Sequence, residues 1–393
     1  MFAILRYIRR NWFELLITVL IFSNLYPRYF SRYFYYVGIA LALFKMLRMR
    51  CSFRSSGTIT LVFLFMVWLS TIINFALDLR PVVFTAIVVA TSAMCTSLRM
   101  HLWKRKLMRN LFIGFAASAV VSLISKAMGY NYQVIKRGHN LVLGDEFSGV
   151  AAGPMWNSAA SAVAMIFFSY LLFRTGRKKL WITAALIFLD LGAAYSCIIS
   201  ASRSAFAFGV LACALLLYFL SKNMGKILKY VIIFGIILSF SYPFFYAGAK
   251  RMLAKQEGTT VEHNSRSGLW TARMAEFNSS PVFGVGFAVH GVDDEQTLGH
   301  DESGSSWLAV LAQSGLLGFI CVVAIWLKSL LSYRRIKYDP FNILCYALLI
   351  WFTLHSMFEG YMFQGGWYMC FICWLCVGIV NEAAMYRKTL MQC

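Results

Sequence analysis

The chain has 393 residues, of which 60% are hydrophobic and only 13% are charged, and its mean hydropathy is +0.66. A soluble domain carries about 25% charged residues, so this composition excludes a soluble enzyme. The 37 basic residues outnumber the 16 acidic ones, which gives a net charge of +21. Most basic residues flank apolar runs, so they indicate membrane topology rather than binding to nucleic acid.

Apolar runs of about 17–22 residues recur along the chain, and each is long enough to cross a bilayer as a helix. Basic residues concentrate in alternate loops, which places both termini in the cytoplasm by the positive-inside rule. We therefore predict an all-α integral membrane protein of about 12 transmembrane helices, N-in/C-in, forming one polytopic domain over residues 1–393. The first span is expected to be a retained anchor rather than a cleaved signal peptide. The predicted spans are 11–27, 31–47, 58–77, 81–98, 110–128, 157–173, 180–200, 203–221, 226–247, 307–330, 341–358 and 366–383.

A long polar loop, residues 250–306, separates the ninth and tenth spans on the predicted extracytoplasmic side. Long polar loops beside a membrane bundle are where sites are usually built. A cap at Asn264–Ser265 followed by the segment 266–277 predicts an amphipathic helix that lies on the membrane surface as a lid. Residues 280–286 (Ser-Pro-Val-Phe-Gly-Val-Gly) predict a turn. The apolar face of the helix is expected to contain Leu269, Trp270, Met274 and Phe277, whereas Arg266, Arg273 and Glu276 are polar.

Arg203 is a candidate anion-binding residue at the outer start of the eighth span. Ser202 and Ser204 flank it, and a guanidinium with two hydroxyls near a helix N-terminus suits a phosphate or pyrophosphate. Arginines are usually scarce on this side of a membrane. The alternative is an arginine that only extends to the lipid–water interface.

Arg266 is a second candidate, because it leads the predicted loop helix and faces the same compartment as Arg203. It can bind another phosphate or stabilise a leaving group, although it can equally be a solvated surface charge. Arg273 follows two helical turns later on the same face and is a weaker candidate.

The acidic end of the loop contains candidates for a general base. His300, Asp301 and Glu302 precede the tenth span, and each side chain can take a proton from a sugar hydroxyl. The alternative is a polar loop end at the membrane surface.

Other polar residues lie within or at the ends of spans. Asp190 is inside the seventh span, where a carboxylate is costly unless it faces a cavity or a partner. His355 and Glu359, one helical turn apart at the outer end of the eleventh span, can line the same cavity. Three cysteines in the last span imitate a metal-binding spacing, but no histidine or carboxylate accompanies them, so we interpret them as packing residues: Cys370, Cys373 and Cys376.

Three segments in order resemble the O-antigen ligase and O-antigen polymerase (Wzy) superfamily. Residues 202–211 are similar to its Ser-Arg-Gly/Ser-Ala helix, and residues 266–286 resemble its Arg-x-x-x-Trp…Pro-x-x-Gly-x-Gly loop. Residues 305–319 resemble the helix that follows that loop, so the resemblance covers about residues 202–320.

The resemblance implies a glycosyltransferase of surface polysaccharide or lipopolysaccharide biosynthesis, multi-pass in the bacterial inner (plasma) membrane, with a periplasmic active site. Its substrates would be undecaprenyl-pyrophosphate-linked glycans, with Arg203 and Arg266 binding the pyrophosphate. Metal and cofactor would not be needed, and a chain-length regulator protein is a possible partner beside membrane lipid. Ligases of the family carry a histidine at the position of Gly304, so this chain is expected to polymerise repeat units, with inversion at the anomeric carbon.

Three other functions compete with the polymerase. A ligase would transfer the lipid-linked glycan to an acceptor such as lipid A-core. A glycolipid flippase or other transporter would place its charges near the midplane on broken helices, whereas the candidates here cluster at the outer surface. A membrane scaffold would carry out no chemistry.

Overall fold

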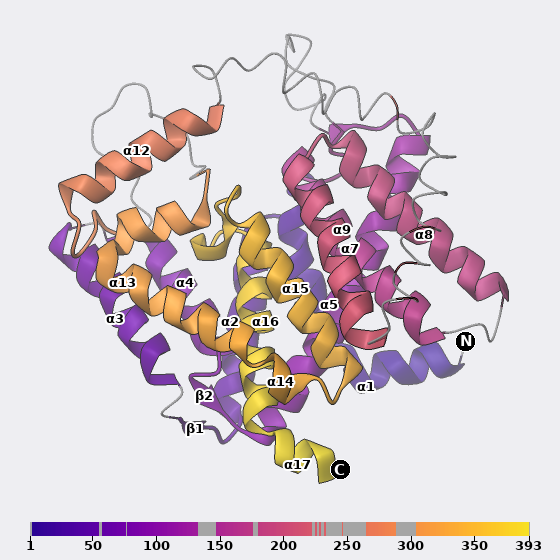
Figure 1. Cartoon of the computed structure of the whole chain (residues 1–393), viewed down its shortest axis with the longest axis horizontal. Coiled ribbons are helices and arrows are strands. Elements are labelled where there is room, and N and C mark those ends of the chain that lie inside the picture. Colours follow the sequence, from indigo (N-terminus) through magenta and orange to yellow (C-terminus); the bar gives the residue numbers. More distant parts are fainter. Residues whose placement is uncertain are drawn as a thin grey trace. The chain divides into compact units, whose positions relative to one another are not determined.

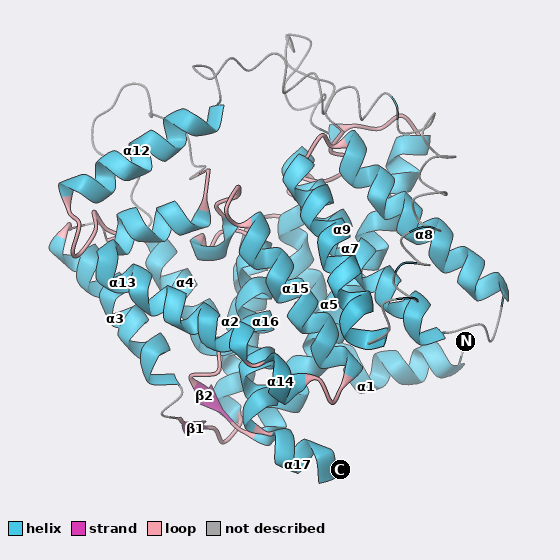
Figure 2. Ribbon diagram, in the orientation of Figure 1, coloured by secondary structure: helices cyan, strands magenta, loops and turns pink. Residues whose placement is uncertain are grey.

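The computed structural model describes residues 2–54, 57–75, 77–132, 147–175, 180–221, 225, 228, 232, 246, 265–287 and 304–392. In this part of the chain the structure is helical apart from one short pair of strands (Figure 2). Most of the predicted ninth span and the loop end with His300, Asp301 and Glu302 lie outside the described residues.

Each of the other predicted spans overlaps a helix. Six helices in the described ranges are long and apolar enough to cross a membrane (α5, α7, α8, α9, α13 and α16), while α3, α4 and α15 are apolar but shorter. Together these helices indicate a multi-pass membrane protein, and the total of about 12 spans and their orientation stay predictions. The helix bounds are α1 Phe2–Phe22, α2 Tyr33–Arg48, α3 Thr58–Ile73, α4 Leu79–Thr91, α5 Leu98–Ala127, α7 Pro154–Thr175, α8 Leu180–Ile199, α9 Arg203–Ser221, α12 Ser265–Ser279, α13 Ser306–Leu331, α14 Tyr333–Ile336, α15 Pro340–His355, α16 Tyr368–Met385 and α17 Arg387–Gln392.

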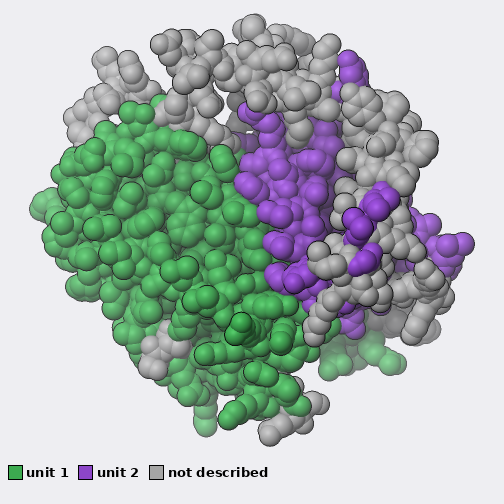
Figure 3. Space-filling model, viewed as in Figure 1, with its two compact units in different colours: residues 1–21, 35–108, 259–393 green, residues 22–34, 109–258 purple. Residues whose placement is uncertain are grey.

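The chain divides into two compact units, coloured separately in Figure 3. Unit 1 comprises residues 1–21, 35–108 and 259–393, and unit 2 comprises residues 22–34 and 109–258. A single domain over 1–393 stays a prediction.

Aromatic side chains form the core of unit 1, where α13 packs against α3, and α16 packs against α4 and α15. The Trp374 ring of α16 is fully buried and meets Trp326 of α13 edge-on at 5.3 Å between ring centroids. It also stacks on Phe63 of α3 at 6.1 Å. Its indole N–H donates to the Met362 carbonyl over 3.0 Å, so the one polar atom of this ring is satisfied.

Helix α13 is interrupted at Gly315, whose φ of 66° and ψ of −173° are not helical. The predicted turn at residues 280–286 lies against this break. The Leu316 N–H donates to the Pro281 carbonyl over 2.8 Å, and a Cβ atom at Gly315 would collide with the Val282 carbonyl oxygen. Glycine is therefore required at this position for two reasons, its positive φ and the close approach of another backbone segment.

The turn also satisfies carbonyl groups that the break leaves without helical partners. The Val285 and Gly286 N–H groups donate to the carbonyls of Ala312 and Gln313 over 3.0 and 3.2 Å. Ser70 of α3 accepts a further bond from the Gly286 N–H (3.0 Å) and donates to the Gln313 carbonyl (2.6 Å). Irregular backbone inside a membrane bundle is stable only when its polar groups are paired in this way.

The opposite end of unit 1 is formed by segments that the charge rule places in the cytoplasm, together with β2 (Cys95–Thr96), which lies within the predicted span 81–98 because α4 ends earlier, at Thr91. Strand β1 (Ser52–Phe53) pairs antiparallel with β2, and Arg105 forms an ion pair with Asp339. Figure 1 shows β1, β2, α14 and α17 together at one end of this unit and α12 at the other. Within unit 1, segments predicted on one side of the membrane thus contact each other.

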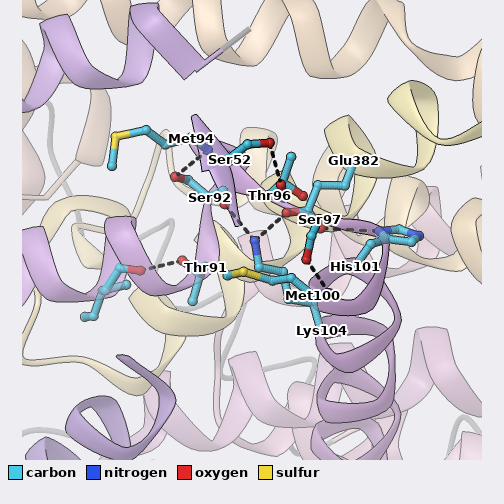
Figure 4. A network of polar contacts seen from close by, with 11 residues as sticks. Ser52, Thr91, Ser92, Met94, Thr96, Ser97, Met100, His101, Lys104 and Glu382 are labelled. Carbon is cyan, nitrogen blue, oxygen red and sulfur yellow. Dashed lines mark hydrogen bonds and ion pairs between the residues drawn. The ribbon is translucent and has the colours of Figure 1, made fainter. Parts of the chain in front are cut away.

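A buried ionic network joins α5 to α16 at this end (Figure 4). The Lys104 ammonium lies 2.6 Å from the Glu382 carboxylate and donates to the Ser92 carbonyl over 2.7 Å. The His101 Nδ1 atom lies 3.3 Å from the second carboxylate oxygen, and the side chains of all three ionisable residues are 0% exposed. Lys104 is therefore a structural residue rather than one of the surface charges that flank a span.

Candidate functional site

Arg203 lies at the first residue of α9 in unit 2, where the chain reverses after α8. The turn uses Ala201 at a φ of 54°, a positive value that is uncommon for a residue other than glycine. The Phe206 N–H donates to the Ser202 carbonyl over 3.3 Å, so Ser202 precedes the first helical turn. Arg203 is exposed, and within the described ranges no hydrogen bond or ion pair involves its guanidinium. The N-terminus of α9 therefore presents an exposed guanidinium at the positive end of a helix, which is an arrangement that suits anions.

A buried network of hydroxyl and amide groups supports this turn from inside unit 2. Asn157 of α7 donates to Ser196 and Ser200 of α8 over 3.1 and 3.0 Å. Ser122 of α5 and Ser161 of α7 lie 2.7 and 3.1 Å from the same Ser196 hydroxyl. The bonds fix the end of α8 and hence the position of Arg203. Our sequence analysis missed this network, although a run of small polar residues at the start of a predicted span was a signal for it.

Segments predicted to be extracytoplasmic meet around the same turn. The Ser200 hydroxyl donates to the Phe147 carbonyl over 2.7 Å, and the Phe147 N–H donates to the Ile199 carbonyl over 3.3 Å. The Ala152 N–H donates to the Leu25 carbonyl over 2.9 Å. The end of the unit that presents Arg203 is therefore an ordered surface.

In unit 1, α12 confirms the helix that the loop sequence predicts, but a different face is buried. Arg273 and Glu276 form an ion pair at 2.7 Å with side chains only 7% and 8% exposed, whereas Met274 is 39% exposed. The expected grouping of Met274 with the apolar face is wrong. The physical reason is that two opposite charges three residues apart neutralise each other and so can face inward. The Nε atom of Arg273 is buried with no partner among the described residues, so one edge of its guanidinium still has a donor available.

Trp270 attaches α12 to the segment before α13. Its indole N–H donates to the Gly304 carbonyl over 3.2 Å, and its ring lies 6.3 Å from that of Phe358. Gly304 has a φ of 64°, and a Cβ atom there would lie 3.1 Å from the Leu269 Cβ. The position at which the resemblance implies a histidine in ligases is thus a tight glycine turn under α12.

Residues 188–323 match a family model described as O-antigen ligase. This part of the chain is similar to the O-antigen ligase family. No curated protein matches the chain. The matched segment includes Arg203, α12, the glycine turn and the interrupted part of α13, so it confirms the resemblance on the same segments. The match thus indicates a protein related to O-antigen ligases over this segment, within a multi-pass membrane protein.

His355 and Glu359 lie in unit 1, after the matched segment, and are buried, at 1% and 2% exposure. The His355 ring stacks on Trp351 at 4.5 Å, and its Nδ1 atom lies 3.0 Å from the Tyr361 hydroxyl. The Glu359 carbonyl accepts the Ser306 hydroxyl over 2.6 Å. These contacts place both residues in the turn that supports the start of α13.

The other residues that the sequence singled out lie elsewhere in the structure. Asp190 is buried in α8 and accepts a hydrogen bond from the Ser169 hydroxyl over 3.0 Å. The carboxylate thus faces a polar partner on α7. The side chain of Arg266 lies outside the described residues, although its backbone is in the first turn of α12. Within the described ranges no group of three His, Cys, Asp or Glu side chains is placed to bind a metal ion. Three cysteines are buried in α16: Cys370, Cys373 and Cys376.

Proposed function

We propose that the chain polymerises undecaprenyl-pyrophosphate-linked oligosaccharide repeat units of a surface polysaccharide, on the periplasmic face of a bacterial inner membrane. The observation that carries this proposal is the exposed Arg203 at the N-terminus of α9, inside the segment that is similar to the O-antigen ligase family. An acceptor hydroxyl attacks the anomeric carbon, the bond to the pyrophosphate breaks, and the sugar is transferred with inversion.

Arg203 binds the pyrophosphate of the donor lipid in this proposal. The leaving group gains negative charge as the glycosidic oxygen departs, and a guanidinium at a helix N-terminus stabilises that charge without a metal ion. Ser202 and Ser204 add hydroxyl donors to the same anion. The ordered turn that holds Arg203 means that little reorganisation is needed at the moment of reaction.

Arg266 and Arg273 on α12 are the proposed second source of positive charge. Glu276 already neutralises the charge of Arg273 through its Nη1 atom, so Arg266 has the larger expected role. The acceptor hydroxyl must lose a proton, and His300, Asp301 and Glu302 are the proposed bases.

Gly304 favours a polymerase over a ligase. A side chain at this position would need a positive φ and would press against the Leu269 Cβ at 3.1 Å, so the backbone here disfavours a catalytic histidine. A ligase that transfers completed glycan to lipid A-core remains the competing function.

Arg203→Ala in a deletion strain tests the proposal through the size distribution of the surface glycan. We expect single repeat units instead of long chains, because removing one such electrostatic contact lowers a rate by about 10²–10³-fold. Arg203→Lys should restore part of the chain length, since it keeps the charge but loses the bidentate geometry. Arg174→Ala is the matched control, because Arg174 is an exposed arginine in the last turn of α7, outside the matched segment, and it should leave chain length unchanged.

Two results would replace the polymerase with another function. Accumulation of long lipid-linked polymer that never reaches its acceptor would identify a ligase. Translocation of the lipid-linked glycan by the purified protein, with no new glycosidic bond, would identify a flippase. Long chains that persist in Arg203→Ala would contradict the proposed role of this residue.

A further inference from the structure

A groove in unit 1 opens between the last turns of α13, α14 and the end of α16. Its volume is about 450 Å³, within the roughly 300–1,000 Å³ of pockets that hold small ligands. Leu327 and Leu331 of α13 line it and are 52% and 79% exposed, and Met385 of α16 is 37% exposed. Two alanines, Ala324 and Ala384, leave room between the helices. Most of the wall is therefore apolar and open to the surroundings of the bundle.

The same groove has two cationic side chains, Lys328 and Arg335. Both are exposed, and no Asp or Glu is among the described residues that line the groove. The neighbouring carboxylate in sequence, Glu382, is buried and bound by Lys104. The groove thus combines an apolar wall with two basic side chains.

We propose that this groove binds an anionic diacyl phospholipid. The phosphate contacts Lys328 and Arg335, and part of an acyl chain lies along Leu327 and Leu331. The charge pattern of the sequence places this end of unit 1 at the cytoplasmic leaflet, where anionic lipids are attracted by basic residues. A neutral lipid would use only the apolar wall, and a free phosphate would use only the two cations. Both features together select an anionic lipid.

The binding of dioleoyl-phosphatidylglycerol to the purified full-length protein, measured by native mass spectrometry against dioleoyl-phosphatidylcholine, tests this site. The attraction between one basic side chain and an anionic lipid changes the binding affinity about fivefold. We therefore expect Arg335→Ala and Lys328→Ala each to weaken retention of phosphatidylglycerol about fivefold, with phosphatidylcholine unaffected. Arg334→Ala is the matched control, because Arg334 is an equally exposed neighbour in α14 that does not line the groove.

A second variant tests the apolar part without changing charge. Ala384→Leu fills the groove and should release phosphatidylglycerol, while the thermal transition in phosphatidylcholine shows that the protein is still folded. Glycerol phosphate without acyl chains should not compete. The proposal is overturned if Arg334→Ala weakens binding as much as Arg335→Ala, which would mean general surface attraction. It is also overturned if Ala384→Leu retains the lipid, or if glycerol phosphate displaces it.

Discussion

Replacing Lys104 with methionine should destabilise unit 1 severely, because it leaves the Glu382 carboxylate buried without its cation. Both side chains are 0% exposed and lie 2.6 Å apart, so water cannot compensate for the loss. Removing one partner of a buried pair costs about 3–5 kcal/mol. We expect a loss of this size in the free energy of unfolding, measured by reversible titration with SDS in mixed micelles. Lys337→Met, at an exposed position, is the control and should change stability by less than about 0.5 kcal/mol.

The double variant Lys104→Met with Glu382→Leu separates the charge effect from lost packing. Apolar pairs that replace buried ion pairs are often neutral, but here the Ser92 carbonyl and His101 also lose a partner. Each buried polar group left unpaired costs about 1–3 kcal/mol. The double variant should therefore be more stable than Lys104→Met alone, yet below the wild type. If the effects of the two single changes simply add, or if Lys104→Met is no worse than Lys337→Met, the reasoning is refuted.

Two substitutions, tested by the same unfolding titration, and one labelling experiment test local features. Gly315→Ala should lower the free energy of unfolding by more than about 2 kcal/mol, because a positive φ is unfavourable and the new Cβ collides with backbone. Gly268→Ala is the control on α12, where the glycine is exposed and has open space around it. It should raise the free energy of unfolding by roughly 0.5–1 kcal/mol. Asn157→Ala should cost about 1–3 kcal/mol, since two buried hydroxyls lose their donor. A membrane-impermeant maleimide should label Cys51 and Cys95 in inside-out vesicles but not in intact cells if the predicted orientation is right. Burial raises the pKa of the Cys95 thiol, so its labelling rate should still increase at a pH where an ordinary thiol is already ionised.

Local patterns were sufficient to predict most helices. A run of apolar residues specifies a membrane helix by itself, because in lipid the backbone must satisfy its own hydrogen bonds. The helix α12 was also predictable from a capping residue and the helical spacing of its apolar residues. The turn at residues 280–286 was predictable because a proline is followed by two glycines. The break at Gly315 was not, because it depends on backbone groups of that turn, which lie some thirty residues earlier in the chain.

Charged residues were harder to interpret than apolar ones. The positive-inside rule treats Lys104 as one more basic residue at the end of a span, and nothing near it in sequence shows that Glu382 is its partner. Arg273 and Glu276 are three residues apart, so their pairing was visible in the sequence, but the choice of the inward face depends on what α13 offers in unit 1. Arg203 became a candidate because of its unusual position, and the structure adds Asn157 and the serines that hold its turn.

Gly304 connects these observations to the chemistry. A catalytic side chain must lie on backbone that can carry it, and here the backbone has a φ of 64° and lies against Leu269. Its carbonyl also accepts the Trp270 indole, which attaches α12 to the start of α13. A residue with these three constraints serves the architecture of the loop and not proton transfer. Under the proposed polymerase, the base would come from another position or be unnecessary, and in either case stabilisation of a leaving pyrophosphate by Arg203 would be the larger part of catalysis.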